Sequence, residues 1–564
     1  MPSAFILIIA IGVFILGYVF YGKYLARKIG LDLKNKTPCH TMKDGVDYVP
    51  AKWPVLLGHH FASIAGAAPI IGPITAAVFG WIPVFLWIIF GNVFMGAVHD
   101  FTSLVASARH KGRSIGKVIE EHIGIHGKIL FLIFAWFTLV LVVAAFVILV
   151  AKTFVSTPEV STASFLFILL AVVFGFSIYR MKTGLLTATL VGVALLIICI
   201  WIGNQFPIVF SPDKAQAQLV WTLIILGYIF IASVTPVWIL LQPRDYLNSN
   251  LLYLVLIFSF FGILIANPSI KFPAFTSFSH PSLGLLFPIL FVTVACGAIS
   301  GFHSLVASGT TSKQLNCETD ARPVGYGGML IEGLLAVIAL ITAIILIPSE
   351  YQQFFPQGGN ADPITLFANG VGGFISKLGI PVKIGIVFAA MAVAEFALTS
   401  LDTATRLGRF TFQEFFRSEK PSRIRALLTN RFVATFFTIL PGGILALSGS
   451  YQAIWPIFGS ANQLLAAIAL LAVSVWLAKK RMKNHFVKYP MFIMFAITLS
   501  ALVVLVYEKV NLVIRYFSDK AVPESFNLIG TFFLLLVALM LFGVAVSLVY
   551  QAAKSLKSKR QNLR

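Results

Sequence analysis

The stretch EFALTSLDTATR, residues 395–406, places hydroxyl groups and a carboxylate on adjacent positions of an otherwise apolar run. Oxygen-rich clusters suit a hard cation, and a carboxylate that can be neutralised suits a proton. The sequence therefore predicts a coupling site for H⁺ or Na⁺, made of Thr399, Ser400, Asp402 and Thr403. The alternative is structural, because Asp402 also lies one helical turn before Arg406 and the two side chains can pair.

Three further acids lie within apolar stretches: Asp100, Glu332 and Glu395. An ionisable group inside a bilayer is costly and by default suggests a function. Asp100 follows His99 and lies near Arg109, so its position fits both a role in gating and a structural ion pair. Glu332 and Glu395 are single acids on apolar runs and are open to the same two interpretations, gating or structure.

A second pattern is the stretch GHHFASIAGAAPIIGP, residues 58–73, where glycines and prolines interrupt a run that would otherwise cross a membrane. Backbone groups freed inside a bilayer need partners, so such a break survives only where protein or a water-filled cavity supplies them. Its exposed N–H groups and a histidine suit an anionic substrate. The candidate substrate-binding residues here are His59, His60, Ser63, Gly66, Ala67, Ala68 and Pro69. His59 and His60 point about 100° apart on a helix, so one can face a cavity while the other packs.

A related stretch, CGAISGFHSLVASGTTSK, occupies residues 296–313. His60 lies six residues before Gly66, and His303 lies six residues before Gly309. Gly301, His303 and Ser304 are the candidate substrate-binding residues of this stretch, although a membrane histidine is often only a hydrogen-bonded packing residue. By the topology given below the two stretches run antiparallel. This arrangement is typical of an inverted repeat of broken helices with a substrate site between them.

The composition predicts an all-α, polytopic membrane protein: 58% of the 564 residues are hydrophobic and only 11% are charged. About fifteen apolar runs approach the roughly 20 residues that span a bilayer. They lie at approximately 4–22, 54–80, 82–107, 129–151, 163–179, 184–203, 218–241, 250–267, 284–310, 325–347, 382–404, 431–447, 452–478, 489–507 and 527–551.

Counting five runs from each break predicts the domain organisation. The segments are an extra N-terminal span (1–30), a first five-helix repeat (54–203), two inserted spans (218–267), a second, inverted repeat (284–478), two peripheral spans (489–551) and a basic cytoplasmic tail (552–564). A rival register starts the second half at residue 218, because SVTPVW at 233–238 also interrupts a helix.

The net charge of +21 is distributed by topology. If each run crosses once, 34 of the 42 lysines and arginines fall in the loops of one side. The positive-inside rule then predicts an N-terminus outside and a C-terminus inside the cell. The excess charge is explained by this topology and by attraction to the lipid bilayer, so we expect no nucleic-acid partner.

Several function classes find no support in the sequence. The four cysteines are isolated and show no CxxC or Cys/His spacing, so neither disulfides nor a metal site is predicted. The glycines are embedded in apolar helix instead of following a strand, which argues against a phosphate loop. Nothing resembles a catalytic triad, and we expect a protein that is not an enzyme and needs no cofactor beyond a coupling cation.

Five sequence blocks together carry a resemblance to a known family: DGVDYVPAKWPVLLGHHFASIAGAAPIIGP (44–73), GNVFMGAVHDF (91–101), LQPRDYLN (241–248), NCETDARPVGYGGMLIEG (316–333) and ALTSLDTATR (397–406). These blocks resemble the carbon starvation protein A family of membrane transporters. The resemblance implies an inner-membrane transporter with the leucine-transporter-type inverted five-helix repeat, associated with peptide uptake during carbon starvation. In that architecture the third helix of the second repeat faces the first break across a coupling-ion site, which adds Ala65 to the expected coupling residues.

The resemblance leaves the substrate open between a peptide and pyruvate, which other family members handle. Both carry a carboxylate, and an unwound helix segment suits that group in either case. The coupling ion is open between H⁺ and Na⁺. A channel is the second functional class, because glycine breaks and small residues also line pores. The sequence indicates no oligomeric state.

Overall fold

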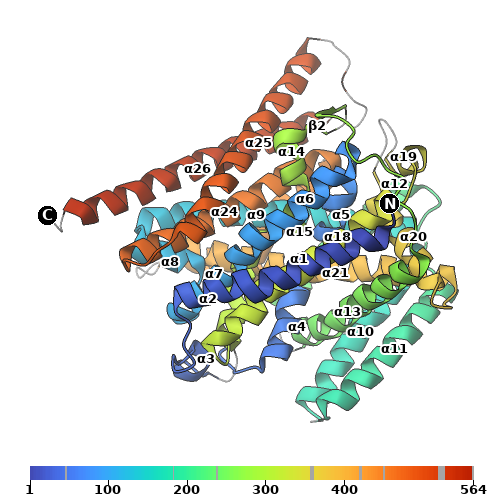
Figure 1. The fold of residues 1–564 in the computed structure, drawn as a ribbon, viewed down its shortest axis with the longest axis horizontal. Helices are drawn as coiled ribbons and strands as arrows, with labels where there is room; N and C mark the ends of the chain where they lie inside the picture. Colours follow the sequence, from blue (N-terminus) through green and yellow to red (C-terminus); the bar gives the residue numbers. More distant parts are fainter. Residues whose placement is uncertain are drawn as a thin grey trace.

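Thirteen helices in the described part of the chain are long and apolar enough to cross a membrane in the computed structural model (Figure 1). A bent pair, α4 (Trp53–Ile64) and α5 (Ala68–Ala76) with the 3-10 turn η2 (Ala77–Phe79), forms a fourteenth candidate, with an angle of 51° at the break. The predicted all-α polytopic fold is confirmed. The structure describes residues 1–44, 47–181, 183–236, 239–281, 283–355, 361–417, 422–448, 451–518, 522 and 527–561.

The elements follow one another as nearly continuous helix. The first part comprises α1 (Ser3–Leu16), the π-helical η1 (Gly17–Gly22), α2 (Lys23–Ile29), α3 (Pro38–Thr41), α4, α5, η2, α6 (Trp81–Gly91), η3 (Asn92–Gly96), α7 (Ala97–Arg109), α8 (Ile115–His122), α9 (Ile125–Ser156), α10 (Pro158–Tyr179) and α11 (Leu185–Gln205). The middle part comprises α12 (Lys214–Val234), α13 (Leu241–Ala266), the antiparallel strands β1 (Ser279–His280) and β2 (Gly284–Leu285), α14 (Leu286–Thr293), α15 (Ala295–Ala298), α16 (Phe302–Val306), η4 (Ala307–Thr311), α17 (Ser312–Gln314), η5 (Glu318–Asp320), η6 (Arg322–Gly327), α18 (Gly328–Ile344), α19 (Pro348–Phe354) and α20 (Pro363–Ser376). The last part comprises α21 (Val382–Phe416), α22 (Arg423–Leu428), α23 (Arg431–Ser448), α24 (Tyr451–Lys479), α25 (His485–Phe517) and α26 (Leu528–Gln561).

The expected count of fifteen spans is corrected at one place. The expected span at 284–310 is divided among α14, α15, α16 and η4, which are too short to qualify as a single membrane helix. The helix stops at Ile299, whose backbone is extended. Gly297 and Gly301 flank this residue, and glycine makes an interruption of a helix easier. The basic tail expected at 552–564 continues α26 as far as Gln561, and residues 562–564 lie outside the described part.

Helices α9, α18, α21 and α24 form the centre of the bundle. In each of them, at least 83% of the most apolar 18-residue window is buried inside the protein. For α11 and α26 the corresponding shares are 33% and 39%. Figure 1 shows α10 and α11 as a pair at one edge and α25 and α26 at another. Their exposed apolar side chains, such as Leu186 and Trp201, fit contact with lipid.

The ends of the long helices follow local signals. Gly124, with a φ of 120°, precedes α9, and Pro158 starts α10 immediately after Thr157. Glycine tolerates this backbone conformation, and proline is favoured in the first turn of a helix. Asn267, with a φ of 38°, ends α13 before Pro268. The ends of α9, between Gly124 and Pro158, are thus marked by residues that can be recognised in the sequence.

Several loops rich in lysine and arginine are joined to one another at one end of the bundle. Arg109 at the end of α7 bonds Glu318 (Nε to Oε1, 2.6 Å), and Lys128 on α9 bonds Glu414 on α21 (3.1 Å). The hydroxyl of Ser555 on α26 donates to the carbonyl of His122 (2.9 Å). These contacts agree with the predicted segregation of positive charge, whereas the orientation in the cell stays a prediction.

Close helix packing at the first break depends on Gly72. A Cβ atom at Gly72 would lie 2.5 Å from the carbonyl oxygen of Thr293 and 2.9 Å from the Cα of Val294, both backbone atoms. Gly12 on α1 has no neighbour within 4 Å at the same position. Only the first of these glycines is therefore required by packing.

We expect Gly72→Ala to destabilise the protein by about 1–3 kcal/mol, the usual cost of overpacking. The matched control Gly12→Ala is expected to be neutral or slightly stabilising, because alanine is favoured over glycine in a helix by about 0.5–1 kcal/mol. Thermal unfolding of the detergent-solubilised variants measures both. Equal melting temperatures for the two variants would show that α5 and α14 are not in close contact.

Candidate functional site

The first break separates α4 from α5 and lies where the sequence predicts it. α4 ends at Ile64, residues 65–67 are not helical, and α5 begins at Ala68. Pro69 lies in the first turn of α5, where a missing N–H costs nothing. The N–H groups of Ile70 and Ile71 donate to the carbonyl of Ala67 (both 3.1 Å), and Pro69 has no N–H, which leaves at most the N–H groups of Ala67 and Ala68 as donors to a ligand. This end of α5 therefore offers donors and the positive end of a helix dipole.

The second break lies between α15 and α16 and is held by a residue that the sequence analysis missed. The N–H of Gly301 donates to the backbone carbonyl of Asn462 (3.0 Å), and the N–H of Phe302 donates to its side-chain Oδ1 (2.9 Å). A Cβ at Gly301 would overlap the Asn462 carbonyl. Asn462 of α24 thus replaces the helical hydrogen bonds that the break removes. In this structure Gly301, predicted to bind substrate, allows the close approach of Asn462.

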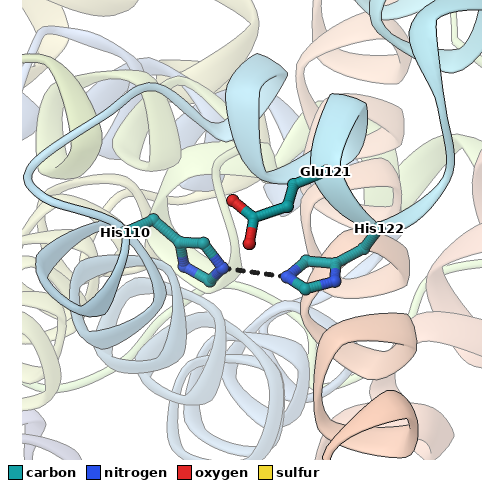
Figure 2. A group of neighbouring side chains, drawn as sticks. All are labelled: His110, Glu121 and His122. Atoms are coloured by element: carbon teal, nitrogen blue, oxygen red, sulfur yellow. Dashed lines mark hydrogen bonds between the residues drawn. The ribbon is translucent and has the colours of Figure 1, made fainter.

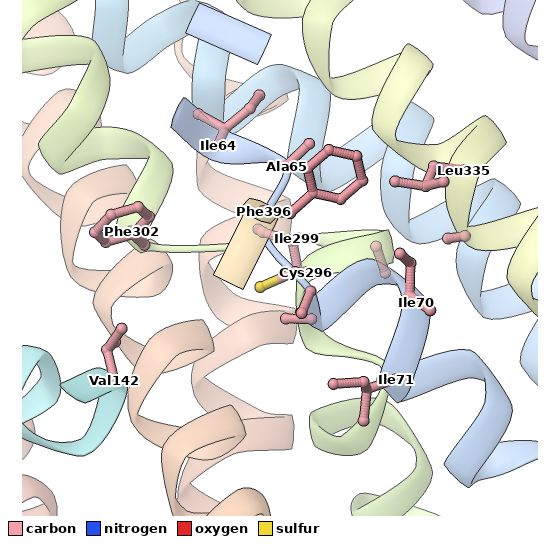
Figure 3. Packing of buried hydrophobic residues seen from close by; sticks show 14 of the residues in the cluster. Ile64, Ala65, Ile70, Ile71, Val142, Cys296, Ile299, Phe302, Leu335 and Phe396 are labelled. Atoms are coloured by element: carbon pink, nitrogen blue, oxygen red, sulfur yellow. The ribbon is translucent and has the colours of Figure 1, made fainter. Parts of the chain in front are cut away.

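The two breaks lie against each other and enclose a small cavity. Figure 3 shows Ala65 in the first non-helical segment close to Ile299 and Cys296 of the second stretch. The cavity has a volume of about 10 Å³. Its lining comes from both breaks and from three central helices: Ile64, Gly66, Ala68, Val142, Phe146, Cys296, Phe302, Ser400, Phe458 and Asn462. This volume is about that of one water molecule.

The cavity is closed around Gly66. A Cβ atom at Gly66 would lie 2.5 Å from the Oγ of Ser400 on α21 and 3.4 Å from the ring of Phe146. Pockets that bind small molecules typically enclose about 300–1,000 Å³. Admission of a peptide or of pyruvate to this cavity therefore requires the helices around Gly66 to move apart.

Beside the breaks lies a buried network of two carboxyl groups and two imidazoles, here called the His303 network. It consists of His99 and Asp100 on α7, His303 on α16 and Glu332 on α18. Asp100 bonds both histidines through its two oxygens, at 2.8 Å from the Nδ1 of each. The Nε2 of His303 lies 3.3 Å from Oε2 of Glu332. All four side chains are fully buried.

This network corrects one of the two interpretations of Asp100. The structural alternative placed Asp100 in an ion pair with Arg109. Instead, Arg109 pairs with Glu318, and Asp100 faces His99 and His303. Arg109 was a poor guide to the partner of Asp100, because the helix separates the two side chains by more than two turns.

Glu120 lies on α8, outside the membrane spans. Its hydrogen bond with Lys117, and to a lesser extent that with Lys128, holds the pKa of Glu120 below its ordinary value.

The neighbouring histidines of α4 point to different places, as the helical geometry predicts. The Nδ1 of His60 lies 2.8 Å from the hydroxyl of Thr311 on η4, and its Nε2 has no bonding partner among the described residues. His59 is partly exposed, and its Nδ1 lies 4.0 Å from Asp245. Neither histidine lines the small cavity. Their proposed contact with substrate would thus arise only in another conformation.

The two candidate serines are buried, and their hydroxyl groups bond to nearby backbone carbonyls. The hydroxyl of Ser63 donates to the carbonyl of His59 (2.9 Å), and that of Ser304 donates to the carbonyl of Gly301 (2.7 Å). These are bonds to the backbone three or four positions earlier in the chain, and neither serine lines the cavity. Ala65 and Ala67 are fully buried at the first break.

A second buried network, here called the Arg244 network, joins α13 and α12 to α21. One nitrogen of Arg244 contacts Asp402 (Nη1 to Oδ2, 2.5 Å), and two others contact Glu395 (Nη2 to Oε2, 3.0 Å; Nε to Oε2, 3.2 Å). The hydroxyl of Tyr228 donates to Asp402 (2.8 Å). Arg244, Glu395 and Asp402 are each 1% exposed or less. Two carboxylates thus share one guanidinium.

The Arg244 network rules out the alternative in which Asp402 pairs with Arg406. The guanidinium of Arg406 donates instead to the backbone carbonyls of Ala232 and Thr235 at the end of α12 (2.8 and 2.7 Å). Arg244 was visible within LQPRDYLN as an arginine beside an apolar run. Its partners could not be read from sequence, since they lie about 150 positions away.

The expected coupling cluster on α21 is divided among three environments. Thr399 accepts a hydrogen bond from Asn248 of α13 (Nδ2 to Oγ1, 3.0 Å), and Asp402 belongs to the Arg244 network. Ser400 faces the first break at Gly66. The hydroxyls of Ser400 and Thr403 are buried without a bonding partner among the described residues. A role for these residues in coupling stays a prediction.

Comparison with known proteins identifies the family. The sequence profile of the family described as carbon starvation protein CstA matches residues 2–359 and 356–501. The chain belongs to this family. It is 33% identical to the peptide transporter CstA of Escherichia coli (strain K12), with 86% of this chain and 78% of that protein aligned. It is also 33% identical to the peptide transporter CstA of Bacillus subtilis (strain 168), over 86% and 87% of the two chains.

Two other similarities bear on mechanism and fold. The pyruvate/proton symporter BtsT of Escherichia coli (strain K12) is 31% identical over 86% of this chain and 78% of that protein. The crystal structure of the manganese transporter of Eremococcus coleocola, in complex with an aromatic bis-isothiourea substituted compound, shares the fold with a TM-score of 0.52 and 12% identity, and covers 91% of this chain and 99% of that chain. This family member is therefore a multi-pass membrane transporter.

Arg244 is expected to be essential for stability because its removal leaves Glu395 and Asp402 buried and uncompensated. Breaking a buried ion pair from one side typically costs about 3–5 kcal/mol. We expect Arg244→Met to lower the melting temperature of the solubilised protein strongly. The exposed Arg417 at the end of the same α21 provides the control Arg417→Met, which should be neutral.

A triple variant separates loss of charge from loss of packing. Combining Arg244→Met with Glu395→Gln and Asp402→Asn removes all three charges, so much of the lost stability should return. If Arg244→Met is as stable as the parent protein, or if the triple variant is less stable than Arg244→Met alone, the two carboxylates do not depend on this arginine.

Proposed function

We propose that this chain is a secondary active transporter that imports small carboxylate-bearing nutrients, peptides in the first place, with the proton as coupling ion. The observation that carries the proposal is the meeting of two interrupted helices at a small cavity, in a protein that also contains two buried ionisable networks. The proposed location is the inner membrane of a prokaryote, with the N-terminus outside and the C-terminus inside. Carbon starvation, the condition in the family's name, is the proposed physiological setting.

The proposed substrate site is the first break, where α5 begins. A helix N-terminus favours an anion through its free N–H groups and the helix dipole. A carboxylate there would accept hydrogen bonds from the N–H groups of Ala67 and Ala68 when the cavity opens. Two relatives named as peptide transporters support peptides as the substrate class.

The balance of charge in the Arg244 network supports a proton as the coupling ion. When Glu395 and Asp402 are both ionised, one negative charge exceeds the single positive charge of Arg244. An uncompensated charge away from water is costly, and protonation of one carboxyl group removes it. Binding of one proton would therefore make the charge of these three groups balance.

The His303 network provides a second place for the transported proton. Its four titratable groups lie in hydrogen-bonding or ion-pair contact from His99 to Glu332, next to α16. Such chains of acids and histidines are typical of proton relays in transporters. A movement of α16 during opening of the cavity would break the contacts of His303 and change where the proton is held.

Pyruvate is the alternative substrate, favoured by the similarity to a pyruvate/proton symporter. Both substrates share the carboxylate that the first break suits, but they differ in size and in the positive amino group of a peptide. Uptake of a radiolabelled dipeptide and of labelled pyruvate into proteoliposomes distinguishes them. We expect accumulation of the dipeptide when the outside is more acidic, and no stimulation by a sodium gradient at equal pH. Accumulation driven only by sodium would contradict the proton proposal.

Asp402→Asn tests whether the Arg244 network couples uptake to the proton gradient. The variant keeps the shape of the side chain but leaves Glu395 to balance Arg244 alone. We expect gradient-driven uptake to fall at least about tenfold, which corresponds to a loss of about 1.4 kcal/mol. Exchange of labelled for unlabelled substrate at equal pH should be retained, because it requires binding but no net proton movement.

The exposed acid Asp213 provides the matched control. It caps α12, and asparagine can cap a helix equally well, so Asp213→Asn should transport as the parent protein does. Normal accumulation by Asp402→Asn under every imposed gradient would show that Asp402 is structural and that its bond with Arg244 serves only folding. Loss of exchange together with uptake would instead indicate a role in substrate binding.

A further inference from the structure

Two histidines and a glutamate meet at the end of the bundle that carries the basic loops, away from both breaks. His110 caps the end of α7, and Glu121 and His122 form the last turn of α8. Figure 2 shows the three side chains gathered together, with a ring nitrogen of each imidazole directed toward the other ring. One potential ligand atom from each residue lies within 4.8 Å of the other two.

The separation of the imidazole nitrogens fits a shared metal ion. The Nε2 atoms of His110 and His122 lie 2.9 Å apart. At zinc–nitrogen distances of about 2.0–2.1 Å, two ligands at angles of about 90–109° lie roughly 2.9–3.4 Å apart. The histidines therefore need to separate by no more than about half an ångström to bind one ion. The exposed Glu121 carboxylate is free to approach from the solvent side.

A hydrogen bond on the far side of His110 prepares it as a ligand. Its Nδ1 lies 2.6 Å from the carbonyl of Ala106, to which it donates. This bond places the proton on Nδ1 and leaves the lone pair of Nε2 directed at His122. Metal-binding histidines characteristically donate their other N–H in this way. The edge-on contact of the ring with Trp476, at 5.4 Å between centroids, holds its orientation further.

The backbone of His122 is also held in place by a hydrogen bond. Its backbone carbonyl accepts the hydroxyl of Ser555 from α26. Without a metal, the Nε2–H of His122 must donate to the bare Nε2 of His110. A metal would replace this proton, which moves to Nδ1 of His122, and would link α7 and α8 through a stronger bond.

The ligand set selects the class of metal. Two imidazoles and one carboxylate suit zinc and similar transition metals, whereas magnesium and calcium prefer oxygen ligands alone. Lys479 and Lys480 act electrostatically on His122, and their positive charge opposes a cation. This repulsion favours a modest affinity over that of a structural zinc site.

We propose that His110, Glu121 and His122 form a binding site for a zinc-like divalent transition metal that clamps the end of α7 to α8. The site is independent of the proposed transport of carboxylates. The sequence analysis predicted no metal site, because His110 and His122 are twelve positions apart and are brought together only by the turn between α7 and α8.

Calorimetric titration of the tag-free, full-length protein with Zn²⁺ tests the proposal. We expect one site of micromolar affinity. His110→Ala and His122→Ala should each weaken binding at least about tenfold, the lower range seen when the surroundings of a metal site are altered. His126→Ala is the matched control, because this exposed histidine lies four residues from His122 but outside the cluster, and it should bind as the parent protein does.

The shift of the melting temperature with Zn²⁺ provides a second measurement. Ligand binding to the folded state raises it, so the parent protein and His126→Ala should both respond, and His122→Ala should not. If removal of a histidine prevents folding, Glu121→Gln on the surface replaces it and should also weaken binding. No Zn²⁺ binding by the parent protein, or unchanged binding by His110→Ala, His122→Ala and Glu121→Gln, would overturn the site.

Discussion

The requirement that every backbone group inside a bilayer finds a partner governs this structure. Two helices are interrupted in its centre, and each interruption needs donors or acceptors from elsewhere. At the second break Asn462 of α24 supplies both its backbone and its side-chain oxygen. At the first break Gly66 and Ala68 line a cavity too small for a nutrient. This difference is the reason for proposing the first break, and not the second, as the place where a substrate binds.

The buried charges are arranged around this centre. The Arg244 network joins α12 and α13 to α21, which also carries Ser400 against the first break. The His303 network joins α7 and α18 to α16, the helix that follows the second break. A change of protonation in either network therefore acts on a helix next to a break. This connection offers a physical route by which proton binding and opening of the cavity influence each other.

The sequence predicted the interrupted helices well and the partners of the charged residues poorly. Gly66, Pro69 and Gly301 act on the local backbone, so their consequences can be read from neighbouring positions. The pairing of Asp402 with Arg244 connects residues far apart in the chain, and sequence spacing suggested Arg406 instead. Asn462 gave no signal at all, because one asparagine on an apolar helix does not reveal which backbone it will meet. The imidazole pair of His110 and His122 depended in the same way on a turn whose shape the sequence did not specify.

The central claim is that the proposed carboxylate-bearing substrate crosses the membrane together with protons. Proteoliposomes that enclose a pH-sensitive dye, with equal pH and no sodium on both sides, test it most directly. Addition of a dipeptide outside should acidify the interior, because substrate moving down its own gradient carries protons with it, and Asp402→Asn should abolish this acidification. Entry of labelled dipeptide without any change of internal pH would contradict the account.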